Sequence, residues 1–349
     1  MRPSALAWIV CVVLLTGAAC GRRSTLPPAV GDQEFWQLSA SLSEPPGTFT
    51  VSDNFVSNEP HVSDNARWLR RAGGVYIGVG PEQNFTYIAR LRPSMAFVVD
   101  IRRENRNLHL LYKALFEIAS TRADFVSLLF SRLRPASLPA GASVEQIFTA
   151  YAGVPPSPAL FTLNAALIRD RLLQVHGFPL EASDLEWIDR AYRAFFTDGP
   201  EIQFWGSRSV DPGTIRPSYR RLMTAPDFTG QRRSFLASEE DFQAVKALEV
   251  RNLIVPVIGD FGGADAIRRV GDYVRARGGT VRAFYGSNVG VYLTNDQTRQ
   301  FCRNLAGLPA SSNAWFIESD GVRSFSSKLS ACAPAKTETT KSPAAPSLR

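Results

Sequence analysis

Residues 73–103 carry the stretch that decides the fold, GGVYIGVGPEQNFTYIARLRPSMAFVVDIRR. Two short apolar runs, 74–79 and 95–100, are separated by a segment over 82–91 whose pattern predicts a helix. Parallel strands need a long crossover between them, usually helical, whereas a hairpin needs only a short turn. The stretch therefore predicts a parallel βαβ unit within an α/β sheet.

The turn after the first run has the residues of a ligand site. Gly78 and Gly80 let the backbone turn sharply and approach a ligand, and the following helix offers free N–H groups and a positive dipole end. Asp100 ends the second run about twenty residues further on, where such folds hold a ribose. We therefore predict an adenosine half-site. The alternative is a ligand-free sheet that uses both glycines only to turn.

The glycine pattern departs from that of dinucleotide-binding folds. Gln83 stands where their motif has its third glycine. This departure argues against NAD or FAD, and the segment resembles the looser turn of class I S-adenosylmethionine methyltransferases. The resemblance implies S-adenosylmethionine as the cofactor, with the ribose on Asp100 and the methionine end near Glu82 or Gln83. Its expected binding residues are Gly78, Gly80, Glu82, Gln83, Asn84, Asp100 and Arg102.

Two further residues are candidates for catalysis. Asp260 and Tyr285 follow or end later apolar runs, where an acceptor could be deprotonated or oriented. The alternative for Asp260 is an N-cap of the next helix, and for Tyr285 a place in the core. Residues before the first strand could close over the ligand or simply cap loops, and they are Asn54, Asn58 and Glu59.

The rest of the chain extends the sheet. Further strands are predicted at 234–237, 252–258, 280–285 and 314–317, with helices over 107–119, 238–248, 264–277 and 297–305. Strand signals are scarce between about 121 and 230, where the spacing is helical. The prediction is a Rossmann-like, doubly wound, mostly parallel α/β domain over 51–333, with a helical insertion at about 121–230. Residues 334–349 lack large apolar side chains and are expected to be disordered.

The N-terminus has the pattern of an export signal. Arg2 precedes an apolar run and then small residues up to Cys20, which resembles a bacterial lipoprotein cleavage site. We expect residues 1–19 to be a signal peptide, Cys20 to be lipidated, and 20–50 to be a tether and a loosely structured arm. The alternatives are ordinary cleavage nearby or an uncleaved anchor. The expected location is the periplasmic side of the bacterial cell envelope, with the membrane as a partner through the lipid.

Cysteine count and charge limit the remaining possibilities. With Cys11 removed and Cys20 lipidated, Cys302 and Cys332 could pair in an oxidising compartment. The absence of a Cys/His cluster in the sequence argues against a structural metal site. The net charge of +7 is spread among scattered arginines, which argues against a nucleic-acid surface. The expected acceptor is a small molecule or a protein, and the oligomeric state is left open.

Four segments carry a wider resemblance over roughly residues 50–320, namely GVYIGVGPEQNFTYI, FVVDIRR, LIVPVIGDFGG and AFYGSNVGVYL. On them the chain resembles a family of uncharacterised bacterial proteins, some of them lipoproteins, with a methyltransferase-like fold. Gly290 and Val291 stand where related sequences have an acidic or polar pair, which places a catalytic role of that segment in doubt. Two functions follow as hypotheses. One is an envelope-anchored methyltransferase, and the other is a non-catalytic ligand-binding or scaffold lipoprotein with the same fold.

Overall fold

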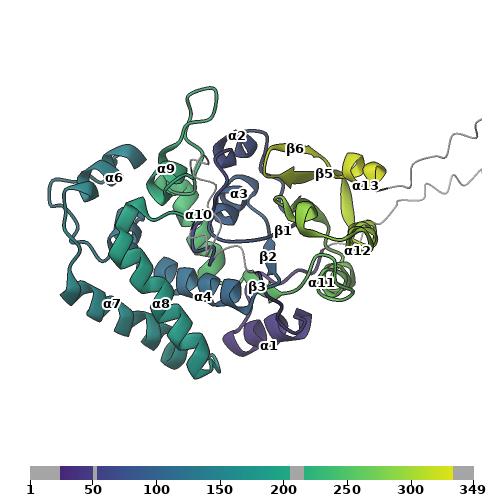
Figure 1. Cartoon of the computed structure of the whole chain (residues 1–349), viewed down its shortest axis with the longest axis horizontal. Helices are drawn as coiled ribbons and strands as arrows, with labels where there is room; N and C mark the ends of the chain where they lie inside the picture. The colour runs from purple at the N-terminus through teal and green to yellow at the C-terminus, as the bar shows by residue number, and fades with distance from the viewer. Residues whose placement is uncertain (1–23, 50–52, 205–215, 333–349) are drawn as a thin grey trace, which may run out of the picture.

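A computed structural model describes residues 24–49, 53–204 and 216–332 (Figure 1). The predicted signal peptide, Cys20 and the C-terminal tail lie outside these ranges. Within them, no helix is long and apolar enough to cross a membrane.

The centre of the molecule is one six-stranded sheet with the order β3-β2-β1-β4-β5-β6. Five strands are parallel, and β6 pairs with β5 in the antiparallel direction. Every residue of β1, β2 and β3 is buried, as expected for parallel strands covered on both faces. The α/β fold with a mostly parallel, Rossmann-like sheet is therefore confirmed. The strands are β1 Val75–Gly78, β2 Met95–Asp100, β3 Ile254–Ile258, β4 Val281–Tyr285, β5 Ala310–Glu318 and β6 Gly321–Ser324.

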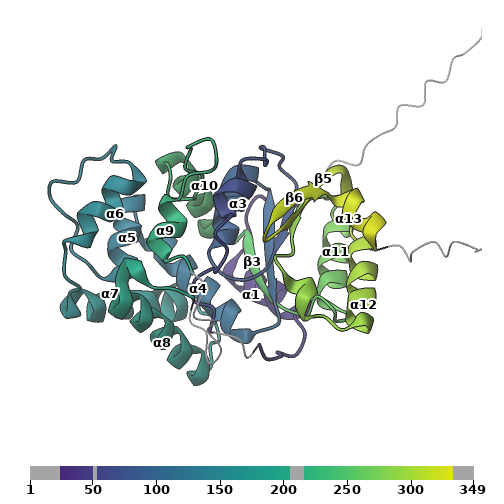
Figure 2. The same ribbon diagram turned by 45° about the horizontal axis from the view of Figure 1, so that its top comes forward.

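Helices cover both faces of the sheet (Figure 2). One side holds α3 (Gln83–Leu91), α4 (Arg103–Ile118) and α10 (Glu239–Val250). The other side holds α11 (Ala266–Ala276), α12 (Asn295–Ala306) and α13 (Phe325–Ala331). The doubly wound arrangement follows because each parallel connection carries a helix back across the sheet.

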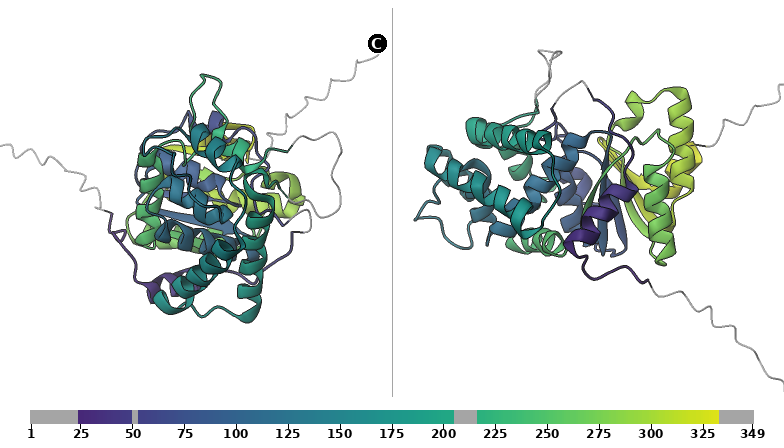
Figure 3. Two further views of the ribbon diagram at one scale, coloured as in Figure 1. Left: turned by 90° about the vertical axis from the view of Figure 1, so that its left-hand side faces the viewer. Right: turned by 90° about the horizontal axis from the view of Figure 1, so that it is seen from below.

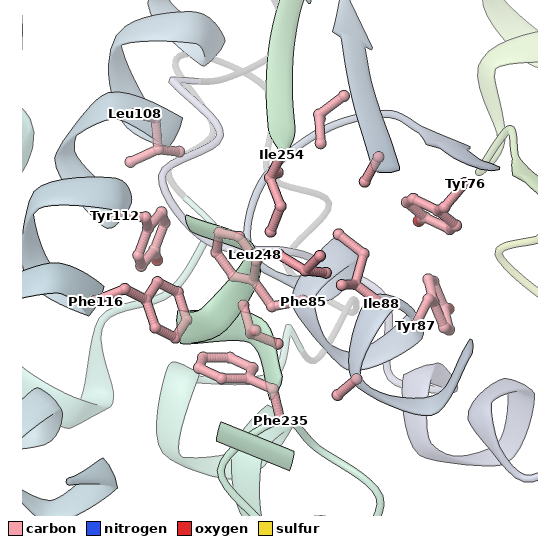
Figure 4. Packing of buried hydrophobic residues seen from close by; sticks show 14 of the residues in the cluster. Tyr76, Phe85, Tyr87, Ile88, Leu108, Tyr112, Phe116, Phe235, Leu248 and Ile254 are labelled. Atoms are coloured by element: carbon pink, nitrogen blue, oxygen red, sulfur yellow. The ribbon is translucent and has the colours of Figure 1, made fainter. Parts of the chain in front are cut away.

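Aromatic side chains fill the space between α3, α4 and α10. Phe85 lies 5.0 Å from Phe116 and 5.5 Å from Phe235, measured between ring centroids. Figure 4 shows these rings converging with Tyr112 of α4 and Leu248 of α10 beneath the sheet residue Ile254. Edge-to-face pairs of this kind stabilise a core beyond their buried area.

The helical segments predicted at about 121–230 lie between β2 and β3 in the chain, on the far side of α4 (Figure 1). Local sequence explains where several begin. Thr121 and Ser143 each form a capping box, and Ser157 caps a helix that has Pro158 in its first turn. The elements are α5 Arg122–Phe130, α6 Val144–Ala152, α7 Pro158–Asp170, η1 Arg171–Val175, α8 Ala182–Asp198, η2 Gly199–Glu201 and α9 Tyr219–Thr224.

The strand predicted at 234–237 is wrong. These residues form a turn before α10, and Phe235 and Leu236 are buried there without joining the sheet. Their apolar character reflects packing of a loop against Phe85, Phe116 and Phe125. The fifth parallel strand is instead β5, which contains the run predicted at 314–317.

The N-terminal arm is more ordered than predicted, because it contains an eleven-residue helix, α1 (Asp32–Leu42). Ser39 Oγ donates a hydrogen bond to the carbonyl of Pro256 in the edge strand β3, and Glu44 N–H donates to Ile258 O at 2.8 Å. Figure 3 shows α1 lying against the sheet. The arm thus covers an open sheet edge, where a proline is tolerated. A second short helix, α2 (Val62–Ala66), precedes β1.

A disulfide ties the C-terminal elements together. Cys302 of α12 bonds to Cys332, the residue that ends α13. The pairing suggested by the cysteine count is therefore present in the structure.

Candidate functional site

A cleft of about 400 Å³ opens at the carboxyl ends of β1, β2, β3 and β4. The strand order changes direction between the neighbouring strands β1 and β4. Open parallel α/β sheets bind their ligands at such a switch point. The lining comes from every one of these strand ends, from the segment before β1, from the segment after η2 and from α12. It consists of Thr48, Phe49, Asn54, Ser57, Asn58, Glu59, Val79, Gly80, Gln83, Asp100, Ile101, Arg102, Phe204, Gly259, Asp260, Phe261, Ser287, Asn288, Val289, Tyr292, Leu293 and Gln297.

Five of the nine predicted cofactor-binding and catalytic residues line this cleft together, namely Gly80, Gln83, Asp100, Arg102 and Asp260. Those outside its lining are Gly78, Glu82, Asn84 and Tyr285. The candidate lid residues Asn54, Asn58 and Glu59 also line it.

Gly78 faces the protein interior. A Cβ on this residue would lie 2.0 Å from Asn84 Oδ1 and 2.5 Å from the Tyr76 hydroxyl, so close packing requires the glycine. Asn84 in turn holds the turn in place, because its Nδ2 donates to three successive backbone carbonyls at 2.7–3.0 Å, those of Val79, Gly80 and Pro81.

Gly80 is the residue at which the first turn meets the cleft. Its φ of +77° favours glycine, and its carbonyl accepts from the Nε2 of His109 at 2.9 Å. Burial lowers the pKa of His109 to about 4, so the ring is neutral at pH 7. Its contact with Gly80 could not be read from the sequence, because nothing in the α4 pattern distinguishes this histidine from a capping residue.

Asp100 is paired with a neighbour on its own loop. Its Oδ1 accepts from the Nε and the backbone N–H of Arg102 at 2.9 and 3.0 Å, and its Oδ2 accepts from Nη2 at 2.9 Å. A carboxylate offers about four acceptor positions, so roughly one remains for a ligand. Arg102 also donates to the carbonyl of Asp53 in the segment before β1.

Glu59 brings a carboxyl group into the cleft from the segment before β1. It is 5% exposed, and its Oε1 accepts a short hydrogen bond from the hydroxyl of Ser287, which follows β4. Its Oε2 has no hydrogen-bond partner within the described ranges. Burial raises the pKa of Glu59 above its ordinary value. A buried, partly unsatisfied carboxyl group in a cleft is a candidate acid or base.

Glu82 and Tyr285 lie behind the cleft wall. Both Glu82 carboxyl oxygens accept from the backbone N–H of Ser57 at 3.2 Å, and burial raises the pKa of this residue to about 8. The Tyr285 hydroxyl accepts from Gln83 Nε2 at 3.1 Å, and burial raises the tyrosine's pKa well above its ordinary value. Tyr285 therefore contacts the side chains of Gln83 and Glu59 from behind, without itself being part of the cleft lining.

Asp260 is held by its own loop rather than capping α11. Its Oδ1 accepts from Gly262 N–H at 2.8 Å and its Oδ2 from Gln297 Nε2 at 3.3 Å. At the start of α11, the backbone N–H groups of Asp265 and Ala266 have no partner within the helix. Both donate to Glu44 Oε1, at 2.7 and 2.9 Å. The arm thus supplies the cap, and Asp260 keeps its place in the cleft lining.

The cleft also has an aromatic side. Phe49 and Tyr292 meet edge to face at 5.2 Å between ring centroids, and Phe204 and Phe261 line the same space. Apolar walls with a few placed polar groups are typical of small-molecule sites. In the part of the chain that the structure covers, no cluster of three or more His, Cys, Asp or Glu residues could hold a metal ion.

Among known protein families, one model matches the chain, a domain of unknown function with the description DUF7790, over residues 54–138 and 185–342. The unmatched residues between these ranges include α6, α7 and η1 of the insertion. Among curated proteins, none matches. Because the matched ranges cover more than half of the sequence and all six strands, the chain belongs to the DUF7790 family.

Proposed function

We propose that the chain is an envelope lipoprotein whose strand-end cleft binds S-adenosylmethionine and transfers its methyl group to an acceptor. The observation that carries this proposal is that Gly80 and Asp100, from adjacent strands, line one cleft at the switch in strand order. This is where sheets of this order bind nucleosides. The methyltransferase-like fold, the lipid at Cys20 and the periplasmic location are parts of the same proposal.

The cleft residues fit a nucleoside in size and in chemistry. A volume of about 400 Å³ lies within the range of small-molecule sites. The remaining acceptor position on Asp100 suits one ribose hydroxyl. The positive φ at residue 80 favours glycine, and because glycine has no side chain a ligand can approach the backbone there. The Phe49 and Tyr292 rings offer faces and edges on which a base could stack.

Bound S-adenosylmethionine would supply an electrophilic methyl group, and the protein would mainly position the acceptor. Glu59 is the residue best placed to take a proton from an acceptor O–H or N–H, because its Oε2 is free of other partners among the described residues. Ser287 orients the carboxyl group through the hydrogen bond to Oε1. Asp260 is the second carboxylate of the cleft, and Tyr285 acts through Gln83 as a positioning residue.

A second function is supported by a specific contact. Arg102 already occupies both oxygens of Asp100, so the residue that would hold the ribose is largely satisfied without a ligand. The predicted export also separates the protein from S-adenosylmethionine made in the cytoplasm. Both points favour a ligand-binding or scaffold lipoprotein without turnover.

Calorimetry distinguishes the two functions. The full chain with Cys20→Ser, which removes the acylated cysteine, is titrated with S-adenosylmethionine and S-adenosylhomocysteine. We expect binding that Asp100→Asn weakens at least tenfold. Asp189→Asn is the control, because Asp189 is also an aspartate paired with an arginine but does not line the cleft. Absence of heat with both ligands contradicts nucleoside binding and favours the second function.

A further inference from the structure

The amino ends of the parallel strands form the edge of the sheet opposite the cleft, and the segments that lead into the strands lie there. Because the strands are parallel, these segments meet at one edge. Backbone hydrogen bonds tie them side by side, for example Ser94 N–H to Gly74 O at 2.7 Å and Val75 N–H to Thr280 O at 2.9 Å. The segments are 67–74, 92–94, 251–253, 277–280 and 307–309.

These five segments contain six arginines and no aspartate or glutamate. Five of the six, together with Arg282 at the start of β4, have no carboxylate partner within the described ranges. The sixth, Arg92, pairs with Asp241, and among the five the Arg67 guanidinium is covered because it stacks on Trp68 and Phe228. The arginine rim is defined as Arg70, Arg71, Arg251, Arg277 and Arg282.

The acidic residues near the rim leave its charge largely uncompensated. Asp272 of α11 is paired with Arg268 and Arg275, which are not rim residues. Glu34 of α1 is exposed and lies near Tyr273, whose ring the Arg277 guanidinium covers at 3.8 Å. Two further carboxyl groups lie close to Arg251: Asp32, which is hydrogen-bonded to His176 and Asn252, and Glu249, whose pKa burial raises to about 8. The five positive charges of the rim therefore exceed the negative charge near them.

The chain enters the fold at this same edge. Thr25 N–H donates to the carbonyl of Arg277 at 2.8 Å, and the backbone N–H of Val30 donates to the carbonyl of Arg251 at 3.0 Å. Cys20 precedes Thr25 by five residues, which span at most about 17 Å when fully extended. A lipid on Cys20 would hold the rim within about two Debye lengths of the bilayer surface.

We propose that the arginine rim docks the domain on anionic phospholipid headgroups, with the cleft facing away from the membrane. Guanidinium groups bind phosphate oxygens in pairs and are weakly hydrated, which suits contact with a headgroup layer. Each arginine that reaches an anionic surface strengthens binding about fivefold. The docking rests on the proposed lipidation only for the closeness of the membrane, because the charge and its placement belong to the folded domain.

Vesicle sedimentation tests this surface with the full chain carrying Cys20→Ser, so that no lipid anchor contributes. We expect binding to vesicles of phosphatidylcholine mixed with phosphatidylglycerol, little binding to phosphatidylcholine alone, and loss of binding at high salt. The double variant Arg71→Gln, Arg251→Gln should weaken binding by more than tenfold. Both arginines are exposed, and thermal unfolding checks that the variant remains folded.

The matched control is Arg169→Gln, Arg190→Gln, which removes the same charge from exposed positions on α7 and α8. This variant should bind nearly as well as the parent chain. Equal loss in both double variants, or no binding to phosphatidylglycerol vesicles, overturns the proposal. The mass of the mature wild-type N-terminus tests the anchor separately. An unmodified Cys20 with a rim-dependent interaction contradicts the lipoprotein proposal and supports the rim.

Discussion

Two buried glutamates beside the cleft differ in what they can do. Glu59 lines the cleft, whereas Glu82 lies behind its wall with no exposed surface. Because burial raises the pKa of Glu82 to about 8, its carboxyl group is mostly neutral at pH 7. Glu82 is therefore a structural residue at neutral pH, whereas Glu59 is the cleft carboxyl group to which our proposal assigns proton exchange with a ligand.

The raised pKa of Glu82 predicts a pH dependence of stability. Below about pH 4.5 the Glu82 carboxyl group is protonated in both the folded and the unfolded state. As pH rises toward 8, this group loses its proton in the unfolded chain but keeps it in the folded protein. The free energy of unfolding should therefore fall over this range, by a few kcal/mol from this residue. Glu82→Gln should flatten the dependence, measured by urea unfolding from pH 5 to 9. Glu240→Gln, at a side chain 86% exposed, should leave the slope unchanged. An unchanged slope in Glu82→Gln contradicts the assignment.

Site residues could be predicted from the sequence where strand position alone decides them. Gly80, Asp100 and Asp260 follow or end parallel strands, so topology brings them to one edge without knowledge of side-chain direction. Gly78 lies outside the cleft because its Cα faces Asn84, and the direction in which a strand residue faces depends on how the strand is rotated. Glu59 and Ser287 are 228 residues apart in the sequence, so no local sequence pattern predicts their contact.

At the scale of elements, a buried carboxylate helps to join the insertion to the sheet domain. Asp184 of α8 accepts from Arg103 Nε at 2.7 Å and from Arg106 Nη2 at 3.1 Å, and both arginines belong to α4. Arg103 therefore belongs to this contact rather than to the cleft, whereas Arg102 lines the cleft. Arg102, Arg103 and Arg106 are close together in the sequence but take part in two separate contacts.

Removing the Asp184 charge should destabilise the protein strongly, because Arg106 loses its carboxylate partner in a largely buried setting and Arg103 keeps only the exposed Glu181. We expect Asp184→Asn to lower the free energy of unfolding by about 3 kcal/mol. The control is Asp189→Asn, an exposed ion pair with Arg169, which should cost less than about 1 kcal/mol. Chemical denaturation measures both, and equal small effects would contradict a fastening role.

The disulfide should stabilise the C-terminal elements. Cys302 and Cys332 are 30 residues apart, and the chain-entropy model assigns such a loop about 3 to 4 kcal/mol. The double variant Cys302→Ser, Cys332→Ser should therefore unfold at lower denaturant, and reductant should move the parent chain to the same midpoint. The double variant itself should not respond to reductant. A parent chain indifferent to reduction would argue against a stabilising bond.

Most helices and strands were predictable because their apolar periodicity is long and bounded by caps and glycines. The turn at Phe235 was mistaken for a strand, since a short apolar run looks alike in a strand and in a buried loop. α1 was missed because neighbouring proline-rich segments dominate the composition, while its stabilisation comes from the β3 edge about 215 residues away. Tertiary contacts, not local preference, decided both elements.

For the whole molecule, our proposals assign different functions to the carboxyl ends and the amino ends of the parallel strands. The carboxyl edge carries the cleft, with Gly80 and Asp100 in its lining, and the opposite edge carries the arginine rim and the entering chain. This polarity follows from the parallel topology, which places strand beginnings and strand ends on opposite sides. A protein held at its rim would present the cleft to the periplasm.

The central claim is that a nucleoside occupies the cleft between Gly80 and Asp100. A crystal structure of the chain grown with S-adenosylhomocysteine tests this claim most directly. Our account predicts ligand density at the ends of β1 and β2, with a ribose hydroxyl within hydrogen-bond distance of Asp100 Oδ2. A cleft that remains without ligand density at saturating concentration, with Arg102 still on both carboxylate oxygens, would contradict it.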